Sequence, residues 1–298
     1  MKKAFALTLT LWIVAMLSLV SVLYLSYGRK VVKKTIELNK KLELTLEAES
    51  TIELLKFYIA TGRIDKDSVV NSKFKDFFPS FPNFLYIDGR EEVLDNRTIK
   101  LQDTAGLVNV YDKEAFANYV AEDLSIEERS IIDGSLRDWL DLDEFSSLNG
   151  AESSFYRQMK YAYGARDEDY ITSIEELFLI RGIDKYKKID KELLTLSTVV
   201  RRNILTMNPK ILGKIYGFTN TDIEQLIESK REGKEFFLSF FYRLNSGGQR
   251  PELDGSITSN ILKVDVVVHR DGVYKKIKLL INFRPNNKHA FKVLEYYD

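Results

Sequence analysis

The chain has 298 residues, of which 45% are hydrophobic and 30% charged, proportions typical of a folded globular protein of one or two domains. Its 44 Lys and Arg residues balance 44 Asp and Glu residues, so overall charge provides no attraction to nucleic acid or to anionic lipid. The sequence contains no cysteine, which excludes disulfide scaffolds, thiolate metal sites and cysteine nucleophiles.

The first predicted element is a membrane-spanning helix over residues 5–27. This run is apolar and uncharged, and it follows a short segment with two lysines. A bilayer core is crossed by about 20 helical residues, whereas the apolar part of a secretory signal is about 7–15 residues long. No pair of small residues typical of a cleavage site closes the run. The length therefore favours a spanning helix over a removed secretory signal.

The charges that flank this span conflict with an outward-facing body. Two lysines precede the span, and four cations follow it: Arg29, Lys30, Lys33 and Lys34. Counting positive charges alone places the large C-terminal part in the cytoplasm.

An amphipathic helix is predicted over residues 28–60. Apolar residues recur at three- and four-residue steps between Leu38 and Ile59, with Glu and Lys between them. The pair Thr61-Gly62 ends the pattern. The span and this segment are thus expected to form one continuous helix whose second half packs on a globular body.

The rest of the chain predicts an α+β body with a helical insertion. Strands are predicted at residues 84–87, 98–101, 107–110, 261–269, 274–283 and 291–296, and helices at 115–120, 127–140, 153–163, 173–180 and 221–231. The turn Arg270-Asp271-Gly272 indicates a hairpin between the late strands. Because the helices lie between early and late strands, they are expected to interrupt one sheet-containing body.

A weak internal repeat lies within the helical block. Residues 173–184 and 208–219 superpose with an offset of 35, and each ends an apolar helical pattern at a glycine, Gly182 or Gly217. Such units resemble helix–hairpin–helix motifs, which can bind DNA phosphates through backbone N–H groups.

This repeat raises an alternative function, a membrane-anchored DNA-binding protein. The cations available near the second hairpin are Lys210, Lys214, Lys230 and Arg231. They fit a solvated helical face equally well, and the chain has no basic excess. We therefore expect no nucleic-acid partner.

Signals for catalysis are poor. The two histidines, His269 and His289, lie in separate late segments, and no nucleotide-binding, metalloprotease or serine-hydrolase motif is present. A membrane-tethered hydrolase that uses paired carboxylates is a further alternative, but nothing singles out one pair. The sequence predicts a protein that is not an enzyme.

The strongest polar constellation surrounds the loop at Asn149-Gly150. Its carboxylates are Asp138, Asp141, Asp143 and Glu152. Ca²⁺ takes six to eight oxygen ligands, which closely spaced acids around a turn can supply, although the pattern is not that of an EF-hand. The alternative is a solvated acidic helix end.

Several segments in order resemble the minor pseudopilin K family of the type II secretion system, also called general secretion pathway protein K. They are LQDTAGLVNVYD at 101–112, the acidic segment 138–156, the repeat unit 173–183 and the segment 194–212. Asn203 and Met207 depart from the family pattern. The resemblance covers nearly the whole chain.

The resemblance implies a pilin-like fold: a long N-terminal helix and an antiparallel sheet, interrupted by a large helical domain with helix–hairpin–helix-like (SAM-like) repeats. The implied divisions are a leader at 1–4, a transmembrane helix at 5–27, a helical extension at 28–60, the first part of the body at 61–112, the helical domain at 113–240 and returning strands at 241–298.

The resemblance also implies processing and location. A prepilin peptidase would cut between Ala4 and Phe5 and methylate the new N-terminus. The protein would then be a single-pass inner-membrane protein with its body in the periplasm, against the simple charge count. A structural Ca²⁺ ion would bind at Asp138, Asp141, Asp143 and Glu152, with Asn149 offering a carbonyl.

The implied role is to cap the tip of the periplasmic pseudopilus and to help initiate its assembly. The implied partners are the minor pseudopilins I and J, followed by H and the major pseudopilin. Leu9 is the fifth residue after the expected cleavage, where most pilin-like subunits carry a glutamate that neutralises a neighbour's amine. A terminal subunit has no earlier neighbour, so an apolar residue is expected there.

Overall fold

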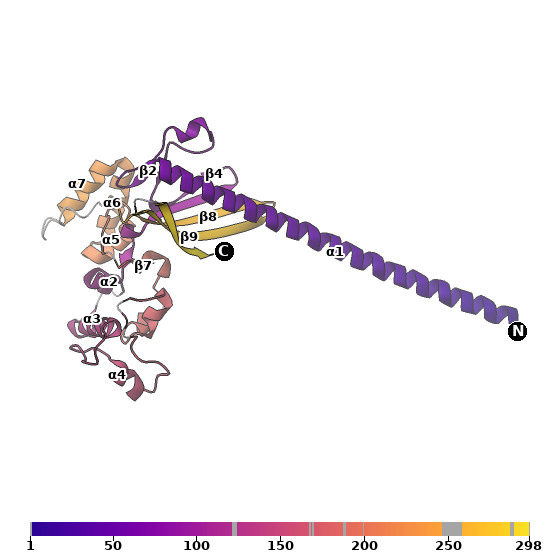
Figure 1. The fold of residues 1–298 in the computed structure, drawn as a ribbon, viewed down its shortest axis with the longest axis horizontal. Helices are drawn as coiled ribbons and strands as arrows, with labels where there is room; N and C mark the ends of the chain where they lie inside the picture. Colours follow the sequence, from indigo (N-terminus) through magenta and orange to yellow (C-terminus); the bar gives the residue numbers. More distant parts are fainter. Residues whose placement is uncertain are drawn as a thin grey trace.

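The computed structural model describes residues 2–120, 124–166, 168, 170–186, 189–198, 200–245, 258–286 and 289–297. One long helix runs out of a body that has a sheet-containing part and a helical part (Figure 1). The helical part lies beyond the end of the sheet, on the far side of the body from the N-terminal end of the long helix.

Helix α1 (Lys2–Thr61) contains both the predicted span and its amphipathic extension. It is long and apolar enough to cross a membrane, and the apolar window is not buried in the body. Its C-terminal part packs on the sheet through one stripe of buried residues at helical spacing: Leu44, Ala48, Ile52, Leu55 and Ile59.

The helix ends as predicted at the Thr61-Gly62 pair. The Gly62 N–H donates to the Tyr58 carbonyl at 3.0 Å. A Cβ at Gly62 would lie 2.9 Å from both that oxygen and Val69, so only glycine fits where the chain turns back.

The main sheet has five antiparallel strands in the order β10-β9-β8-β5-β4. Their bounds are β4 Asp88–Leu94, β5 Arg97–Asp103, β8 Ile261–Arg270, β9 Val273–Asn286 and β10 His289–Tyr297. Because β5 pairs with β8 along its whole length, strands from before and after the helical block share one sheet, as the colours along the sequence show in Figure 1.

The predicted hairpin between β8 and β9 is confirmed. Asp271 and Gly272 both have positive φ, 49° and 76°, the conformation that a two-residue hairpin turn requires. The turn reaches α1, where Lys40 contacts Asp271 at 3.2 Å.

The other strands of the described residues form two smaller sheets. The first is antiparallel and consists of β1 (Arg63–Ile64), β2 (Ser68–Val70) and β3 (Phe84–Tyr86). The second pairs β6 (Val108–Asn109) in parallel with β7 (Leu194–Thr195). The sequence predicted a strand at 107–110, but its partner lies inside the helical part and not in the main sheet.

The helical part begins at α2 and ends at α7. Its α-helices are α2 Lys113–Val120, α3 Ile126–Leu140, α4 Ser153–Gln158, α5 Pro209–Tyr216, α6 Asn220–Glu232 and α7 Lys234–Leu244. Its 3-10 helices are η3 Ile174–Leu179, η4 Asp184–Tyr186 and η5 Lys191–Leu193, while η1 Phe74–Asp76 and η2 Thr104–Gly106 lie in the sheet part.

Two separate apolar cores correspond to these two parts. One lies between α1 and the sheets and includes Leu55, Ile99 and Val266. The other lies among the helices and includes Trp139, Leu177 and Phe241. The sequence prediction of a helical domain inserted into an α+β body is therefore confirmed.

Polar contacts fix the helical part on the sheet part. The buried Asn203 amide donates to the Asp103 carboxylate at 3.0 Å and to the Lys66 carbonyl at 2.7 Å. On another side, Glu192 accepts hydrogen bonds from Lys263 and Lys278 on β8 and β9. These contacts set the direction in which the helical part projects.

Two helical predictions need correction, and one helix was missed. The helix expected over 153–163 ends at Gln158, because Lys160 has a φ of 58° and the chain turns back there, so that Tyr161 and Tyr163 contact the Tyr156 ring. The segment 173–180 is a 3-10 helix and not an α-helix. Helix α7 was not predicted from the sequence at all.

The two units of the internal repeat have the same kind of turn and similar packing, but their helices are of different types. Gly182 and Gly217 both adopt the left-handed conformation, with φ of 86° and 69°. Leu177 and Leu212 are both fully buried at equivalent positions. Only the second unit, α5 and α6 joined at Gly217, has α-helices on both sides of the turn.

Candidate functional site: an acidic site between α3 and α4

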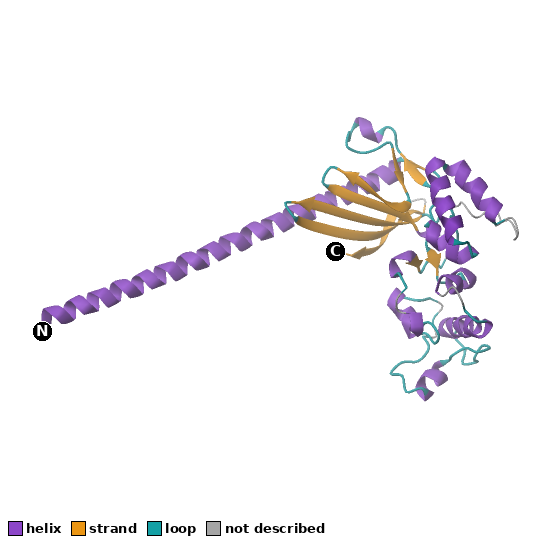
Figure 2. Ribbon diagram, turned by 180° about the vertical axis from the view of Figure 1, so that it is seen from behind, coloured by secondary structure: helices purple, strands orange, loops and turns teal. Residues whose placement is uncertain are grey.

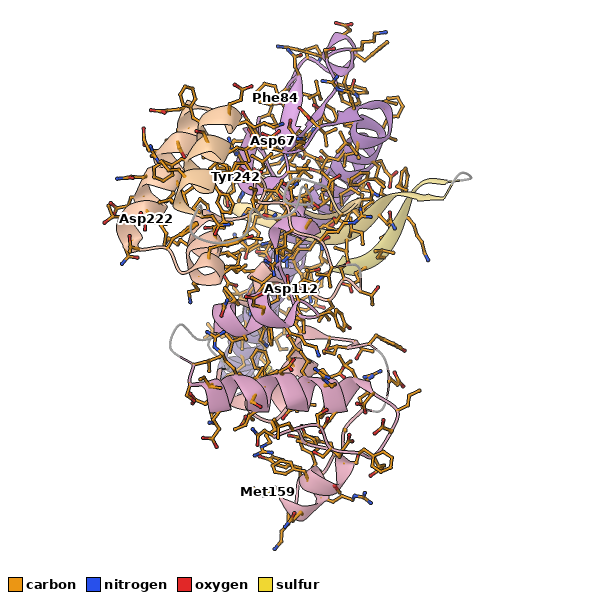
Figure 3. All side chains as sticks on the ribbon, turned by 90° about the vertical axis from the view of Figure 1, so that its left-hand side faces the viewer. Asp67, Phe84, Asp112, Met159, Asp222 and Tyr242 are labelled. Carbon is orange, nitrogen blue, oxygen red and sulfur yellow. The ribbon has the colours of Figure 1, made fainter. Side chains whose placement is uncertain are left out.

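The candidate site forms where α3 ends and the chain loops round to α4, at the lower end of the helical part in Figure 3, where Met159 is labelled. Asp138 lies in the last turn of α3, and Asp141 follows as the C-cap, with its N–H donating to the Arg137 carbonyl at 3.0 Å. Glu152 is the residue before α4. The two helix ends thus bring acids that are 14 positions apart in sequence to one place.

Asp138 is the centre of the loop. Its side chain is fully buried, and its carboxylate accepts hydrogen bonds from the Ser147 N–H at 2.9 Å and the Ser146 hydroxyl at 3.1 Å. Gly150 passes directly over it, since a Cβ there would lie 2.1 Å from Asp138 Oδ2. The loop is therefore built around this carboxylate.

Three carboxylates converge at this point. One oxygen from each of Asp138, Asp141 and Glu152 lies within 4.8 Å of the others, and Glu152 is only 1% exposed. Two like charges at this distance repel by about 3 kcal/mol per pair at an effective dielectric constant of about 20. A bound cation removes this repulsion, and a set of carboxylate oxygens suits a hard ion such as Ca²⁺.

The other two predicted ligands lie outside this group. Asp143 is exposed. Its carboxylate accepts a hydrogen bond from the Phe145 N–H at 2.8 Å and is thereby held against the backbone of its own loop. The Asn149 carbonyl faces the Arg181 guanidinium at 3.4 Å, and its side-chain amide donates to Ser130 at 3.1 Å. The structure thus brings together three of the five residues singled out from the sequence.

Aromatic and charged side chains pack against the acidic loop and hydrogen-bond to it. Trp139 packs edge-to-face on Tyr156 with 5.5 Å between ring centroids, and the Tyr156 hydroxyl accepts from the Arg181 N–H at 3.0 Å. Arg181 also donates to the Gly150 carbonyl at 3.0 Å. These contacts hold the two ends of the acidic loop in place.

Glu176 is another buried acid, close to Trp139, and it has a structural role. Glu176 accepts hydrogen bonds from Trp139 Nε1 at 2.9 Å, from Thr172 and from Arg166. Burial alone would raise the pKa of Glu176, but these hydrogen bonds outweigh it and keep the pKa below its ordinary value. Its acceptor atoms are already occupied by donors of the protein.

Sequence reasoning missed the residues that shape the site without being acidic. Gly150 was noted only as a turn former, and Ser146, Ser147 and Arg181 were not singled out. Their importance depends on contacts across 8 to 31 positions, which no local pattern reveals.

The Gly217 hairpin does not favour the DNA-binding alternative. Lys230 forms an ion pair with the nearly buried Asp88 at 2.9 Å, and Arg231 pairs with Glu228 at 3.0 Å. Lys214 lies over the Tyr119 ring. Lys210 and Lys214 border a cavity of about 650 Å³ between α2 and α5.

The predicted processing residues lie at the start of α1. The backbone of Ala4 and Phe5 is helical, and their side chains lie outside the described part of the structure. Leu9 is 52% exposed on the apolar part of the helix, where it is available to a membrane or a neighbouring subunit.

Comparisons with known proteins show which family and which solved structure this chain resembles. A family model described as type II secretion system (T2SS), protein K, matches residues 100–191, a segment that contains the acidic site. A chain in the crystal structure of the GspK-GspI-GspJ complex from the enterotoxigenic Escherichia coli type 2 secretion system has a similar fold, with a TM-score of 0.56 and 18% sequence identity. The likeness covers 89% of this chain and 98% of that chain. No curated protein matches the chain.

These findings agree with the resemblance identified from the sequence. The fold likeness extends over nearly the whole chain, while the family match is confined to one third of it. The family is a structural component of the secretion machine and not a family of enzymes. Residues 100–191 therefore match the type II secretion system protein K family, and the chain as a whole shares its fold with a chain of the GspK-GspI-GspJ complex.

Proposed function

We propose that this chain is the terminal subunit of a periplasmic pseudopilus and helps to initiate its assembly. The observation that carries the proposal is the position of the helical part, which lies beyond the end of the sheet opposite the N-terminal end of α1 (Figures 1 and 2). Subunits of such a filament pack through their N-terminal helices, so a bulky domain at the far end obstructs a subunit stacked above. Further subunits can then be added only on the side of the N-terminal end of α1.

The partners follow from the same proposal. The E. coli protein with the similar fold was crystallised in a complex with GspI and GspJ. We expect the corresponding I and J subunits to contact this chain first, and H and the major pseudopilin to follow.

The contact surface for these partners is available on α1. Leu42 and Leu46 are exposed on the part of α1 that packs on the sheet, and Val31 and Leu38 continue this apolar spacing on the part that precedes the body. Since α1 already buries its other face on the body, this stripe can receive a neighbouring helix without rearrangement of the fold.

The proposed location is the inner membrane, with the body in the periplasm. The support is the single described helix that is long and apolar enough to span a bilayer, together with the family match. Cleavage by a prepilin peptidase between Ala4 and Phe5, followed by methylation, would leave the apolar segment as the mature N-terminus. Leu9 then occupies the position where a subunit inside the filament needs an acid.

We further propose that Asp138, Asp141 and Glu152 bind a structural Ca²⁺ ion. The support is the convergence of three carboxylates, two of them buried, at the point where α3 ends and α4 begins. The ion would balance the charge at the end of α3 and fasten the loop that leads to α4.

A truncation tests the proposed role. Removal of residues 1–27 keeps both apolar cores intact, so the shortened chain should fold but should not restore secretion in cells that lack the full chain. Circular dichroism checks its folding, and an intact chain expressed at the same level is the control. Restored secretion by the truncated chain would contradict the proposal.

A further inference from the structure

The acidic loop carries a set of large apolar side chains that point into solvent. Leu142, Phe145 and Leu148 are 80%, 85% and 83% exposed, and they lie within seven consecutive residues. Single exposed apolar residues are normal on a protein surface, but a contiguous group marks an interaction site.

This exposure does not come from a loose segment. The Asp143 carboxylate accepts from the Phe145 N–H at 2.8 Å, Asp138 accepts from the Ser147 N–H at 2.9 Å, and Gly150 N–H donates to the Ser147 carbonyl at 2.9 Å. The three apolar side chains are therefore presented on a backbone that is already ordered. A partner that binds them does not need to order the loop first, which lowers the entropy cost of binding.

The charge around these side chains is negative. Asp143 and Glu144 are exposed, Asp141 is half-buried, and no lysine or arginine occurs between Asp138 and Tyr156. Among the described residues, two cations reach the loop from outside it: Arg157 contacts the Glu144 carboxylate at 3.8 Å, and Arg181 donates to the backbone carbonyl of Asn149 at 3.4 Å and so neutralises none of the exposed acids. Charge complementarity thus requires basic groups on whatever covers the loop.

The position of the loop argues against a membrane as the occupant. Helices α3 and α4, which the loop joins, lie on the far side of the body from the N-terminal end of α1 (Figures 1 and 2). The membrane that holds α1 is therefore out of reach, and an anionic bilayer repels the acidic residues of the loop.

We propose that residues 141–149 form a docking loop for a second protein, one that presents an apolar pocket bordered by lysine or arginine side chains. Leu142, Phe145 and Leu148 enter the pocket, while Asp143 and Glu144 pair with its rim. This inference concerns the surface of the helical part and does not depend on the tip position or on Ca²⁺ binding.

A peptide with the stated chemistry serves as the probe. An 18-residue amphipathic helix of Leu and Lys is compared with the same helix in which Glu replaces Lys, and with one in which Ser replaces Leu. Fluorescence anisotropy measures binding to the full chain in phosphatidylcholine nanodiscs, with empty nanodiscs as background. The Leu/Lys peptide should bind at least tenfold more tightly than either of the others.

Variants assign the binding to the loop. The triple variant L142S/F145S/L148S removes only exposed side chains, so it should fold normally and bind the Leu/Lys peptide at least tenfold more weakly. Glu144→Lys should also weaken binding, whereas the control Phe77→Ser, at an equally exposed apolar position (77%) elsewhere, should leave it unchanged.

Three outcomes would overturn the proposal. They are unchanged binding by the triple variant, equal binding of the Leu/Glu peptide, and loop-dependent binding of the chain to phosphatidylglycerol vesicles, which would make a membrane the occupant. Because these measurements use the separate chain, their failure leaves the secretion phenotype untouched and is distinguishable from failure of the proposed function.

Discussion

Gly150 lies so close to Asp138 that a Cβ at position 150 would be 2.1 Å from the Asp138 carboxylate. Any side chain there must displace either the buried acid or the loop. The backbone of the loop and the acid are thus fitted to each other, which is the arrangement expected of a site that presents several oxygens to one ion.

We predict that Gly150→Ala destabilises the helical part by about 2 kcal/mol, because it overpacks a buried site that has no room to expand. Thermal unfolding of the full chain in detergent, followed by the fluorescence of Trp139, measures the effect. Gly28→Ala is the control, since a Cβ at Gly28 meets nothing within 4 Å. An unchanged unfolding temperature for Gly150→Ala would show that the loop is not fitted to Asp138.

Calcium binding should depend on Asp141 and not on Asp143. Asp141 is one of the three convergent acids, whereas Asp143 is exposed and turned into the loop. At a Ca²⁺ concentration of 100 times Kd, a single site stabilises the folded state by about 2.7 kcal/mol. Wild type and Asp143→Asn should both gain this stability on addition of Ca²⁺ and lose it with EDTA.

Asp141→Asn should show no such gain, and isothermal titration should give a flat isotherm. The pair of variants has matched charge, so a general electrostatic effect changes both alike. Equal loss of Ca²⁺ binding in Asp143→Asn would restore the wider ligand set expected from the sequence, and unchanged binding in Asp141→Asn would exclude the site.

The link between the helical part and the sheet should weaken in acid. Burial alone would raise the pKa of Glu192, but hydrogen bonds from Lys263 and Lys278 outweigh it and lower the pKa to about 2. A carboxyl whose pKa is lower in the folded state stabilises the fold above its unfolded pKa, and this contribution is lost as the pH falls from about 4.5 towards 2. Because Glu192 is half exposed, the effect should not exceed about 1 kcal/mol.

Glu192→Gln should therefore lower stability at pH 7 and flatten the pH dependence between pH 5 and pH 2.5. Urea unfolding at several pH values measures both. Glu175→Gln is a suitable control, since Glu175 pairs with Lys191 on the surface of the helical part and does not reach the sheet. Parallel pH curves for wild type and Glu192→Gln would contradict the assignment.

Asn203 should be the most sensitive polar residue at the same boundary. It is fully buried and donates to both Asp103 and the Lys66 carbonyl. Asn203→Ala leaves these acceptors without the donor, which costs about 2–4 kcal/mol for two buried groups. Asn203→Asp should be worse, because it places a second carboxylate against Asp103. A loss below about 0.5 kcal/mol in either variant, measured by urea unfolding, would show that the contact does not hold the two parts together.

Leu9→Glu should disturb assembly more than membrane insertion. A glutamate at this position can pair with the N-terminal amine of another subunit. This pairing favours a position inside the filament over a position at its end. We expect the variant to fractionate with membranes but to reduce secretion, with Leu9→Ile unchanged. Normal secretion by Leu9→Glu would mean that the residue does not influence placement.

The sequence predicted those features that depend on local pattern. The buried stripe of α1, the turn at Asp271-Gly272 and the left-handed glycines Gly182 and Gly217 each follow from spacing or from backbone preference, and the structure confirms them. The helical insertion was also correct, because a change of hydrophobic period from helical to alternating marks its end.

Features that depend on distant contacts were not predictable. The parallel pairing of Val108 with Leu194 joins residues 86 positions apart. Helix α4 stops early because the chain turns at Lys160 and brings Tyr161 and Tyr163 back against Tyr156. At the acidic site, spacing alone could not show that Asp143 bonds to its own loop while Asp138 is buried. The position of Asp138 depends on Ser147 and Gly150, which the loop brings back over it.

The most direct test of the central claim is to locate the chain on isolated pseudopili. A single epitope tag at the C-terminus, detected by immunogold electron microscopy, reports the position and number of copies on each filament. The account predicts one label, at one end only, and a loss of filaments in cells that lack the chain. Labels distributed along the filament length would contradict it.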